Sequence, residues 1–240
     1  MFLIILVLFG SAIVGGLAER FIAFKSGGIK HSLIFAGSFL FSITIIHILP
    51  EIFSLGSNPM RLGLFILLGF FFQQLLEYFT SGVEHGHAHV HNHLSGMSRF
   101  GLVIALMIHS FLEGALLTHD SPFHEQHESY SLLIGIVLHK VPAAFALTTT
   151  LKGGGKFTTQ VWVILLLFAI SSPIGLLLSQ HLIVLSSDHL LTLFAFVSGG
   201  FLHISTTIFV ESSPNHHFAV RKFIVSLLGA AIAIATELFI

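Results

Sequence analysis

The sequence predicts an all-α protein, a polytopic membrane bundle of eight transmembrane helices. Hydrophobic residues make up 54% of the 240 positions and mean hydropathy is +0.95, against only ten basic and eleven acidic residues. This composition excludes an ordinary soluble domain. A bilayer crossing takes about 20 apolar residues, so the chain has room for roughly eight crossings and for no sizeable soluble domain besides them.

Eight apolar runs justify the helix count. The first is longer than the apolar region of a signal peptide and lacks a basic start, so we expect it to be a retained span. A His-rich loop, 80–99, separates the third run from the fourth. We therefore interpret 1–240 as a single transmembrane domain. The expected spans are 1–18, 32–50, 62–79, 98–118, 131–151, 159–178, 190–210 and 223–239.

The basic residues indicate how the bundle is oriented. If the N-terminus faces outside, the inner loops hold eight cations, the outer loops hold only Arg61, and Lys140 lies within the membrane. Basic residues concentrate on the cytoplasmic side, so we expect both termini outside and the His-rich loop inside. The eight inner cations are Arg20, Lys25, Lys30, Arg99, Lys152, Lys156, Arg221 and Lys222.

Two short segments indicate an internal repeat. The second span contains A-G-S-F-L at 36–40, and the seventh contains S-G-G-F-L at 198–202. An acidic residue follows each segment at the far end of its span, Glu51 and Glu211 respectively. The two spans run in opposite directions, so the match favours an inverted repeat in a 3+2+3 arrangement around spans four and five.

Ionisable residues within spans four and five form the candidate site. His109 and Glu113 are spaced i,i+4 and therefore share one helix face, about 6 Å apart along the axis. His139 and Lys140 lie at a matching depth in the next span. Charged groups within a membrane are costly unless they pair or line a wet path, so they mark function. Two imidazoles and one carboxylate suit a borderline divalent ion such as zinc.

The other histidines leave alternatives open. Five of the seventeen alternate through 84–93, with glycine and asparagine between some of them, which is typical of a flexible chelating tract. His47 and His203 are interpreted as either ligands or packed hydrogen-bonding groups. Lys140 is interpreted as a salt-bridge partner of Glu113, a role that is compatible with its filling a second cation position. Glu51, Glu77 and Glu211 lie at span ends, where solvation is the default expectation. An acidic outer loop, 119–128, either gathers cations or is simply solvated.

Four features together resemble the ZIP family of divalent metal transporters. They are H-S-F-L-E-G at 109–114, H-K-V-P-A-A-F-A-L at 139–147, H-I-L-P-E at 47–51 and the His-rich loop. The resemblance implies uptake of Zn²⁺, with Fe²⁺, Mn²⁺ or Cd²⁺ as further cargo, into the cytoplasm. It implies no cofactor.

The resemblance also implies a site between spans four and five. His109, Glu113 and His139 match metal ligands, and Ser110 matches a secondary polar position. Many members place a second carboxylate one turn after the span-five histidine, where this chain has Ala143. With Lys140 beside that histidine, the chain resembles the branch with a single transport site.

Three functions are weighed. A transporter working by alternating access in the plasma or inner membrane is expected, with divalent ions and membrane lipid as partners. Whether the chain forms a homodimer is left open. An intramembrane zinc hydrolase would need the same ligands plus a bound water, but the chain has no H-E-x-x-H string. A membrane metal sensor would bind without flux. The scattered cations predict no nucleic-acid partner, and we expect no enzyme activity.

Overall fold

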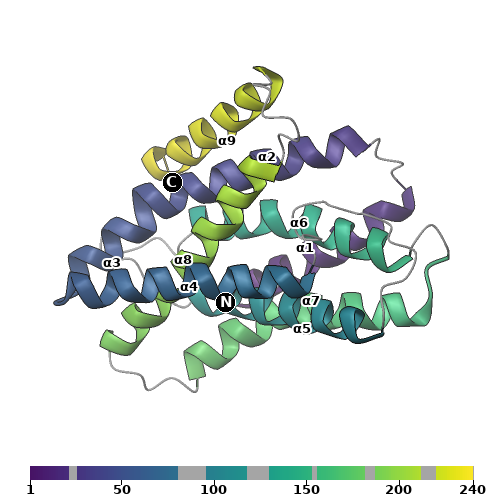
Figure 1. The fold of residues 1–240 in the computed structure, drawn as a ribbon, viewed down its shortest axis with the longest axis horizontal. Helices are drawn as coiled ribbons and strands as arrows, with labels where there is room; N and C mark the ends of the chain where they lie inside the picture. Colours follow the sequence, from purple (N-terminus) through teal and green to yellow (C-terminus); the bar gives the residue numbers. More distant parts are fainter. Residues whose placement is uncertain are drawn as a thin grey trace.

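A computed structural model describes residues 1–21, 26–80, 96–117, 130–152, 156–181, 187–211 and 220–239 (Figure 1). The His tract 84–93 and the outer loop 119–128 lie outside the described residues. Within the described ranges the chain folds into helices, and eight long rods result when α2, η1 and α3 are taken as one. The elements are α1 (Phe2–Phe21), α2 (Ser26–Ile43), η1 (Thr44–Ile48), α3 (Leu49–Leu55), α4 (Pro59–Thr80), α5 (Gly96–Leu116), α6 (Tyr130–Lys152), α7 (Thr159–His181), α8 (Ser187–Glu211) and α9 (Val220–Phe239).

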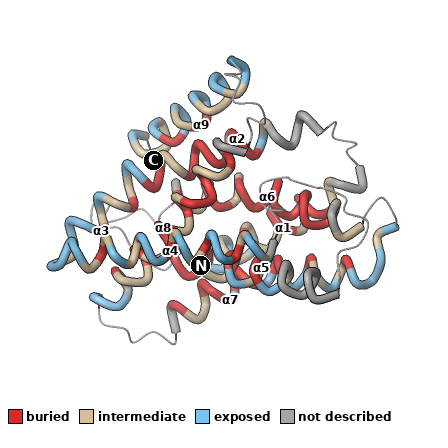
Figure 2. Tube along the Cα trace, viewed as in Figure 1, coloured by how far each residue is buried: buried red, intermediate tan, exposed pale blue. Residues whose placement is uncertain are grey.

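The eight rods confirm the predicted all-α bundle. Among the described residues, five helical stretches are long and apolar enough to cross a membrane by length and composition alone. Shorter apolar stretches occur in α1 and α5. Large apolar side chains are exposed along α4 and α9, whereas the centre of the bundle is buried (Figure 2). Apolar exposure along whole helices is expected where lipid, rather than water, is the solvent.

The second span continues past Pro50, where we expected it to end. A proline inside a helix lacks a donor and clashes with the carbonyl four residues earlier. Here a five-residue π-helical turn, η1, comes directly before it, with the Leu49 N–H donating to the Thr44 carbonyl. The wider turn lets Pro50 stand in the first turn of α3, a position that tolerates proline, and the rod runs on to Leu55.

The helices pack as two groups. One group holds α1, α5, α6 and α7, and the other holds α2, η1, α3, α4, α8 and α9. The tightest contacts lie within groups. A Cβ on Gly114 of α5 would lie 1.9 Å from the Ser172 carbonyl oxygen of α7, and one on Gly69 of α4 would lie 1.7 Å from the Phe196 carbonyl oxygen of α8. Only glycine permits such an approach of two helix backbones.

Side-chain hydrogen bonds and an ion pair also join helices within each group. The Ser38 hydroxyl of α2 donates to the Ser226 carbonyl of α9 at 2.6 Å, and the Thr148 hydroxyl of α6 donates to the Gly16 carbonyl of α1 at 3.2 Å. Arg61 of α4 pairs with Asp188 of α8. Helices α2 and α6 meet across the group boundary through side chains, with the Phe39 ring against Gly135.

The pairing follows the pattern that an inverted repeat requires. If α1, α2 and α4 correspond to α7, α8 and α9, and α5 corresponds to α6, then the α4–α8 pair has its counterpart in α9–α2. The α5–α7 pair likewise has its counterpart in α6–α1. Two pairs of helices that correspond to each other in the repeats, α1–α7 and α2–α8, are also packed together. This arrangement agrees with the 3+2+3 order predicted from the sequence.

Candidate metal centre

Two of the predicted site residues come from one face of α5. His109 and Glu113 are 5% and 1% exposed, and the His109 Nε2 atom lies 3.1 Å from Glu113 Oε1. Helical i,i+4 spacing places them one above the other, as the sequence predicts. The carboxylate therefore points along the helix face toward the imidazole, at the centre of the bundle.

His139 of α6 completes the cluster. Its ring is 1% exposed and meets the His109 ring edge-on, with centroids 5.8 Å apart and an interplanar angle of 88°. One ligand atom each from His109, Glu113 and His139 lies within 4.8 Å of the others. Within the described part of the chain, neither ring nitrogen of His139 has a hydrogen-bond partner. A fully buried imidazole with two unpartnered nitrogens is costly in a protein interior unless a ligand occupies it.

The Lys140 ammonium lies behind the carboxylate and is fully buried. It donates to Glu113 Oε2 at 3.2 Å, to Ser110 Oγ at 2.5 Å and to Ser172 Oγ at 2.6 Å. It also stands 4.6 Å from the centre of the Phe168 ring. An ammonium has three donors, and three acceptors surround this one. Lys140 is therefore the ion-pair partner of Glu113 and simultaneously a resident cation beside it.

Ser110 lies beside this ammonium rather than among the three clustered ligand atoms. Its hydroxyl lies 2.9 Å from the Ser172 hydroxyl, and the Ser172 hydroxyl lies 2.6 Å from the Ser110 carbonyl oxygen. Ser172 of α7 contacts the same ammonium and was not among the residues singled out from the sequence. The close approach of α5 and α7 at Gly114 brings it there, and the only sequence signal was a serine pair beside Pro173 within an apolar run.

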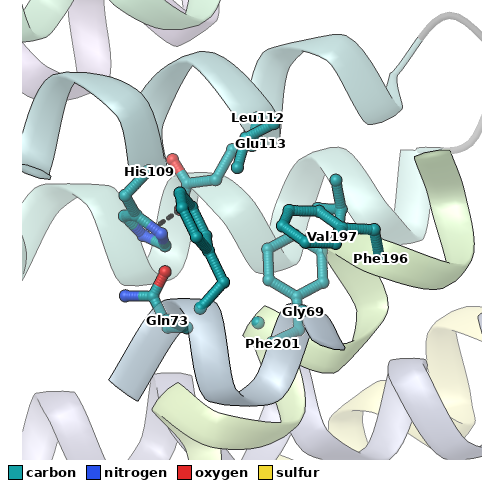
Figure 3. Close-up of a pocket in the computed structure, with 10 residues that line it drawn as sticks. Gly69, Gln73, His109, Leu112, Glu113, Phe196, Val197 and Phe201 are labelled. Carbon is teal, nitrogen blue, oxygen red and sulfur yellow. Dashed lines mark ion pairs between the residues drawn. The ribbon is translucent and has the colours of Figure 1, made fainter. Parts of the chain in front are cut away.

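A small pocket opens on the other side of His109 and Glu113. It is lined by α4, α5 and α8, and Figure 3 shows the Gln73 amide of α4 with its oxygen turned toward His109. Gln73, His109 and Glu113 are its polar lining residues. The remainder is glycine and apolar: Gly69, Phe72, Leu112, Phe196, Val197, Gly200 and Phe201.

Comparison with known proteins places this geometry in a family. A model of the family described as ZIP Zinc transporter matches residues 85–236, more than half of the chain. The chain belongs to the ZIP zinc transporter family. This ZIP chain is 28% identical over 165 residues to Protein zntD of Dictyostelium discoideum, covering 62% of the chain and 24% of that protein. It is 25% identical over 152 residues to Zinc transporter ZIP9 of Xenopus tropicalis, covering 60% of the chain and 50% of that protein.

The family confirms several predictions. The ZIP chain is a multi-pass membrane protein, and its family consists of transporters of metal ions rather than enzymes. The intramembrane hydrolase weighed from the sequence is therefore set aside. The ZIP chain spans only about half of the ZIP9 sequence and about a quarter of zntD.

Two carboxylates expected to be solvated are instead paired and largely buried. Glu77 of α4 is 17% exposed and contacts His203 of α8, with 2.5 Å between Oε2 and Nε2. Glu51 is 12% exposed and lies 3.5 Å from His47. The expectation of solvation is wrong because Glu77 is covered by α8 and Glu51 contacts His47 one turn earlier in the same rod. The Glu211 side chain lies outside the described residues.

His47 has a second acidic neighbour that the sequence did not single out. Its Nδ1 atom lies 2.8 Å from Oε2 of Glu237, near the end of α9. Each ring nitrogen thus faces a carboxylate of its own, an arrangement suited to a hydrogen-bonded chain across η1, α3 and α9.

Proposed function

We propose that this ZIP chain carries divalent metal ions, Zn²⁺ foremost and Fe²⁺, Mn²⁺ or Cd²⁺ less readily, into the cytoplasm. The proposed route is a single site between α5 and α6, and the proposed mechanism is alternating access. The ligands are His109, Glu113 and His139. The name of the curated relative Zinc transporter ZIP9 supports zinc as the first ion to test.

The observation that carries the proposal is the buried cluster itself. Three nitrogen and oxygen ligands from side chains of different chemistry converge with no competing partner for His139 in the described chain. Nitrogen and carboxylate ligands of this kind bind zinc, and three of them leave one position open. An incompletely filled coordination shell binds an ion while leaving a route for its release, which a carrier requires.

Alternating access is supported by where the ligands are attached. His109 and Glu113 belong to α5 and His139 to α6, so all three lie in one helix group. Backbone-to-backbone contacts at glycine hold that group together, whereas side chains such as Phe39 form the boundary with the other group. Side-chain interfaces rearrange more readily than interlocked backbones, so one group can move against the other while the ligand set stays intact.

Lys140 supports a single ion at this site. Its ammonium occupies the place beside Glu113 Oε2 where a second cation would stand. We assign Ser110 to holding that ammonium, together with Ser172, instead of to direct coordination of the transported ion. The distribution of charge supports the proposed orientation: eight cations lie in the expected inner loops, which favours a cytoplasmic position for the His-rich loop.

Uptake of radioactive zinc by proteoliposomes containing the purified chain tests the proposal. His139→Leu should abolish saturable uptake, because it removes a ligand and leaves two. His189→Leu is the matched control, since His189 is exposed near the start of α8, away from the cluster. Wild-type chain that binds zinc but gives no flux would support a sensor and refute a transporter.

A further inference from the structure

Gln73 of α4 is a buried polar side chain that the proposed ligand set leaves unused. It is 2% exposed, and its Nε2 atom has no hydrogen-bond partner among the residues that the structure describes. An amide removed from water without a partner destabilises a fold. A membrane helix with lipid-exposed neighbours such as Phe71 and Leu75 would be more stable with an apolar residue here, so a functional reason for the amide must be sought.

Gln73 lies in the pocket next to the proposed metal site. It shares a pocket with His109 and Glu113, the two α5 residues of the proposed site, and the other lining residues are glycine or apolar. Gly200 of α8 lies against this side chain, because a Cβ there would be in ordinary contact with it, 3.8 Å from the Gln73 Cβ and 3.9 Å from its Oε1. Figure 3 shows the amide of Gln73 and the imidazole of His109 facing each other across this pocket.

We propose that the Gln73 amide oxygen is the fourth contact of the transported ion and a determinant of which divalent ions are carried. The inference rests on the proposed transport function. Three ligands leave a tetrahedral zinc ion one open position, and a neutral amide oxygen on the pocket side fills it directly or through a bound water. The amide can present either oxygen or nitrogen, so reorientation aims the oxygen at the ion.

The position of Gln73 gives this contact a distinct role. The three ligands belong to the α5–α6 group, whereas Gln73 belongs to α4 in the other group. The amide therefore reaches the ion only when the two groups stand as they do in this structure. One turn further along α4, Glu77 pairs with His203, so the same helix face continues as a polar track away from the site. A neutral ligand lets the ion leave, whereas a carboxylate here would hold it.

Two substitutions test the assignment in the full-length chain, assayed by radioactive zinc uptake in proteoliposomes with competing Mn²⁺ and Cd²⁺. Gln73→Leu keeps a side chain of similar size and removes every metal-ligating atom, so the KM for zinc should rise about tenfold and the zinc-to-manganese preference should change. Gln73→Glu adds a charge next to Glu113 and should lower both KM and the maximal rate for zinc. Gln74→Leu is the matched control, because Gln74 is the next residue of the same helix and is exposed.

A thermal melt of each metal-free variant excludes a merely structural role. Gln73→Leu should melt at or above the wild-type temperature, because the variant loses a buried unpaired amide. Unchanged KM and unchanged ion preference in both Gln73 variants, with active wild type, would overturn the inference and leave the transport function standing. Absence of uptake by the wild-type chain would instead refute the proposed function itself.

Discussion

Converting the Lys140 position from a cation to an anion should give the transmembrane site room for a second metal ion. The double substitution Lys140→Asp with Ala143→Glu changes the local charge from that of one cation to that of two anions. Both positions lie on the α6 face behind the ligands and are buried, 0% exposed for Lys140 and 5% for Ala143. The acceptors that surround the ammonium, Ser110 Oγ at 2.5 Å and Ser172 Oγ at 2.6 Å, remain to coordinate an ion in its place.

The geometry indicates how strongly Lys140 excludes a second ion. A divalent ion on Glu113 Oε1 would lie roughly 4 to 5 Å from an ammonium that is itself 3.2 Å from Oε2. Their repulsion at that separation is about 7 kcal/mol for an effective dielectric constant near 20, and two divalent ions would repel by about 15 kcal/mol. The double substitution removes the first repulsion, and two additional carboxylates, each attracting both ions, help to offset the second.

The assay is a metal count on purified protein by elemental mass spectrometry, with the tract 84–93 deleted so that its histidines do not contribute. The parent deletion variant should hold one Zn²⁺ per chain, and the double variant should hold two. Ala143→Glu alone is the control, because it keeps the ammonium and should hold one. Two ions in the parent variant would refute the reasoning, since they would show that Lys140 does not occupy the second position.

Three further predictions follow from the same contacts. Glu113→Ala should abolish saturable zinc uptake in proteoliposomes and lower the melting temperature, because it leaves Lys140 as a buried unpaired charge at a cost of about 3–5 kcal/mol; wild-type uptake would contradict the ligand assignment. Replacing the five tract histidines in 84–93 with serine should leave uptake largely intact, since a flexible tract forms no rigid selective site; complete loss at normal membrane levels would count against this. Gly114→Ala should destabilise the bundle by about 1–3 kcal/mol in a reversible denaturation assay, because its Cβ would lie 1.9 Å from a carbonyl oxygen of α7, whereas Gly63→Ala, with no heavy atom within 4 Å, should be neutral or stabilising.

Much of the fold and the centre of the site could be predicted because membrane helices leave strong local signals. Apolar runs of fixed length gave eight spans, since each backbone must satisfy its own hydrogen bonds in lipid. The i,i+4 spacing of His109 and Glu113 and the matching depth of His139 follow from residue numbers once the helices are known, so the sequence was sufficient to predict them. The prediction that Lys140 pairs with Glu113 required only the positions of these residues in the sequence, and the structure confirms the contact. That the ammonium also fills a second cation position stays a prediction.

The remaining features depend on which helix packs against which. Ser172 belongs to the site because α5 and α7 approach closely at Gly114, and no local pattern encodes that approach. Glu237 pairs with His47 across nearly the whole length of the chain. Gln73 carried a visible signal, a polar residue in an apolar run, but its neighbour Gln74 carried the same one. Only the orientation of α4 about its own axis, which the structure shows, distinguishes the buried Gln73 from the exposed Gln74.

The placement of Lys140 within the ligand-bearing group has a consequence for the empty carrier. Glu113 without a bound ion is a buried carboxylate, and moving it across the membrane without a counter-ion would carry a large desolvation cost. Because Lys140 of α6 and Ser172 of α7 belong to the same helix group as Glu113, their contacts with one another persist through any movement of that group. Had the ammonium stood on α4 or α8, each alternation would break a buried ion pair, at about 3–5 kcal/mol. Under the proposed alternating access, this arrangement would let the unloaded site return with its charge neutralised, and the uncharged Gln73 would be the contact left behind.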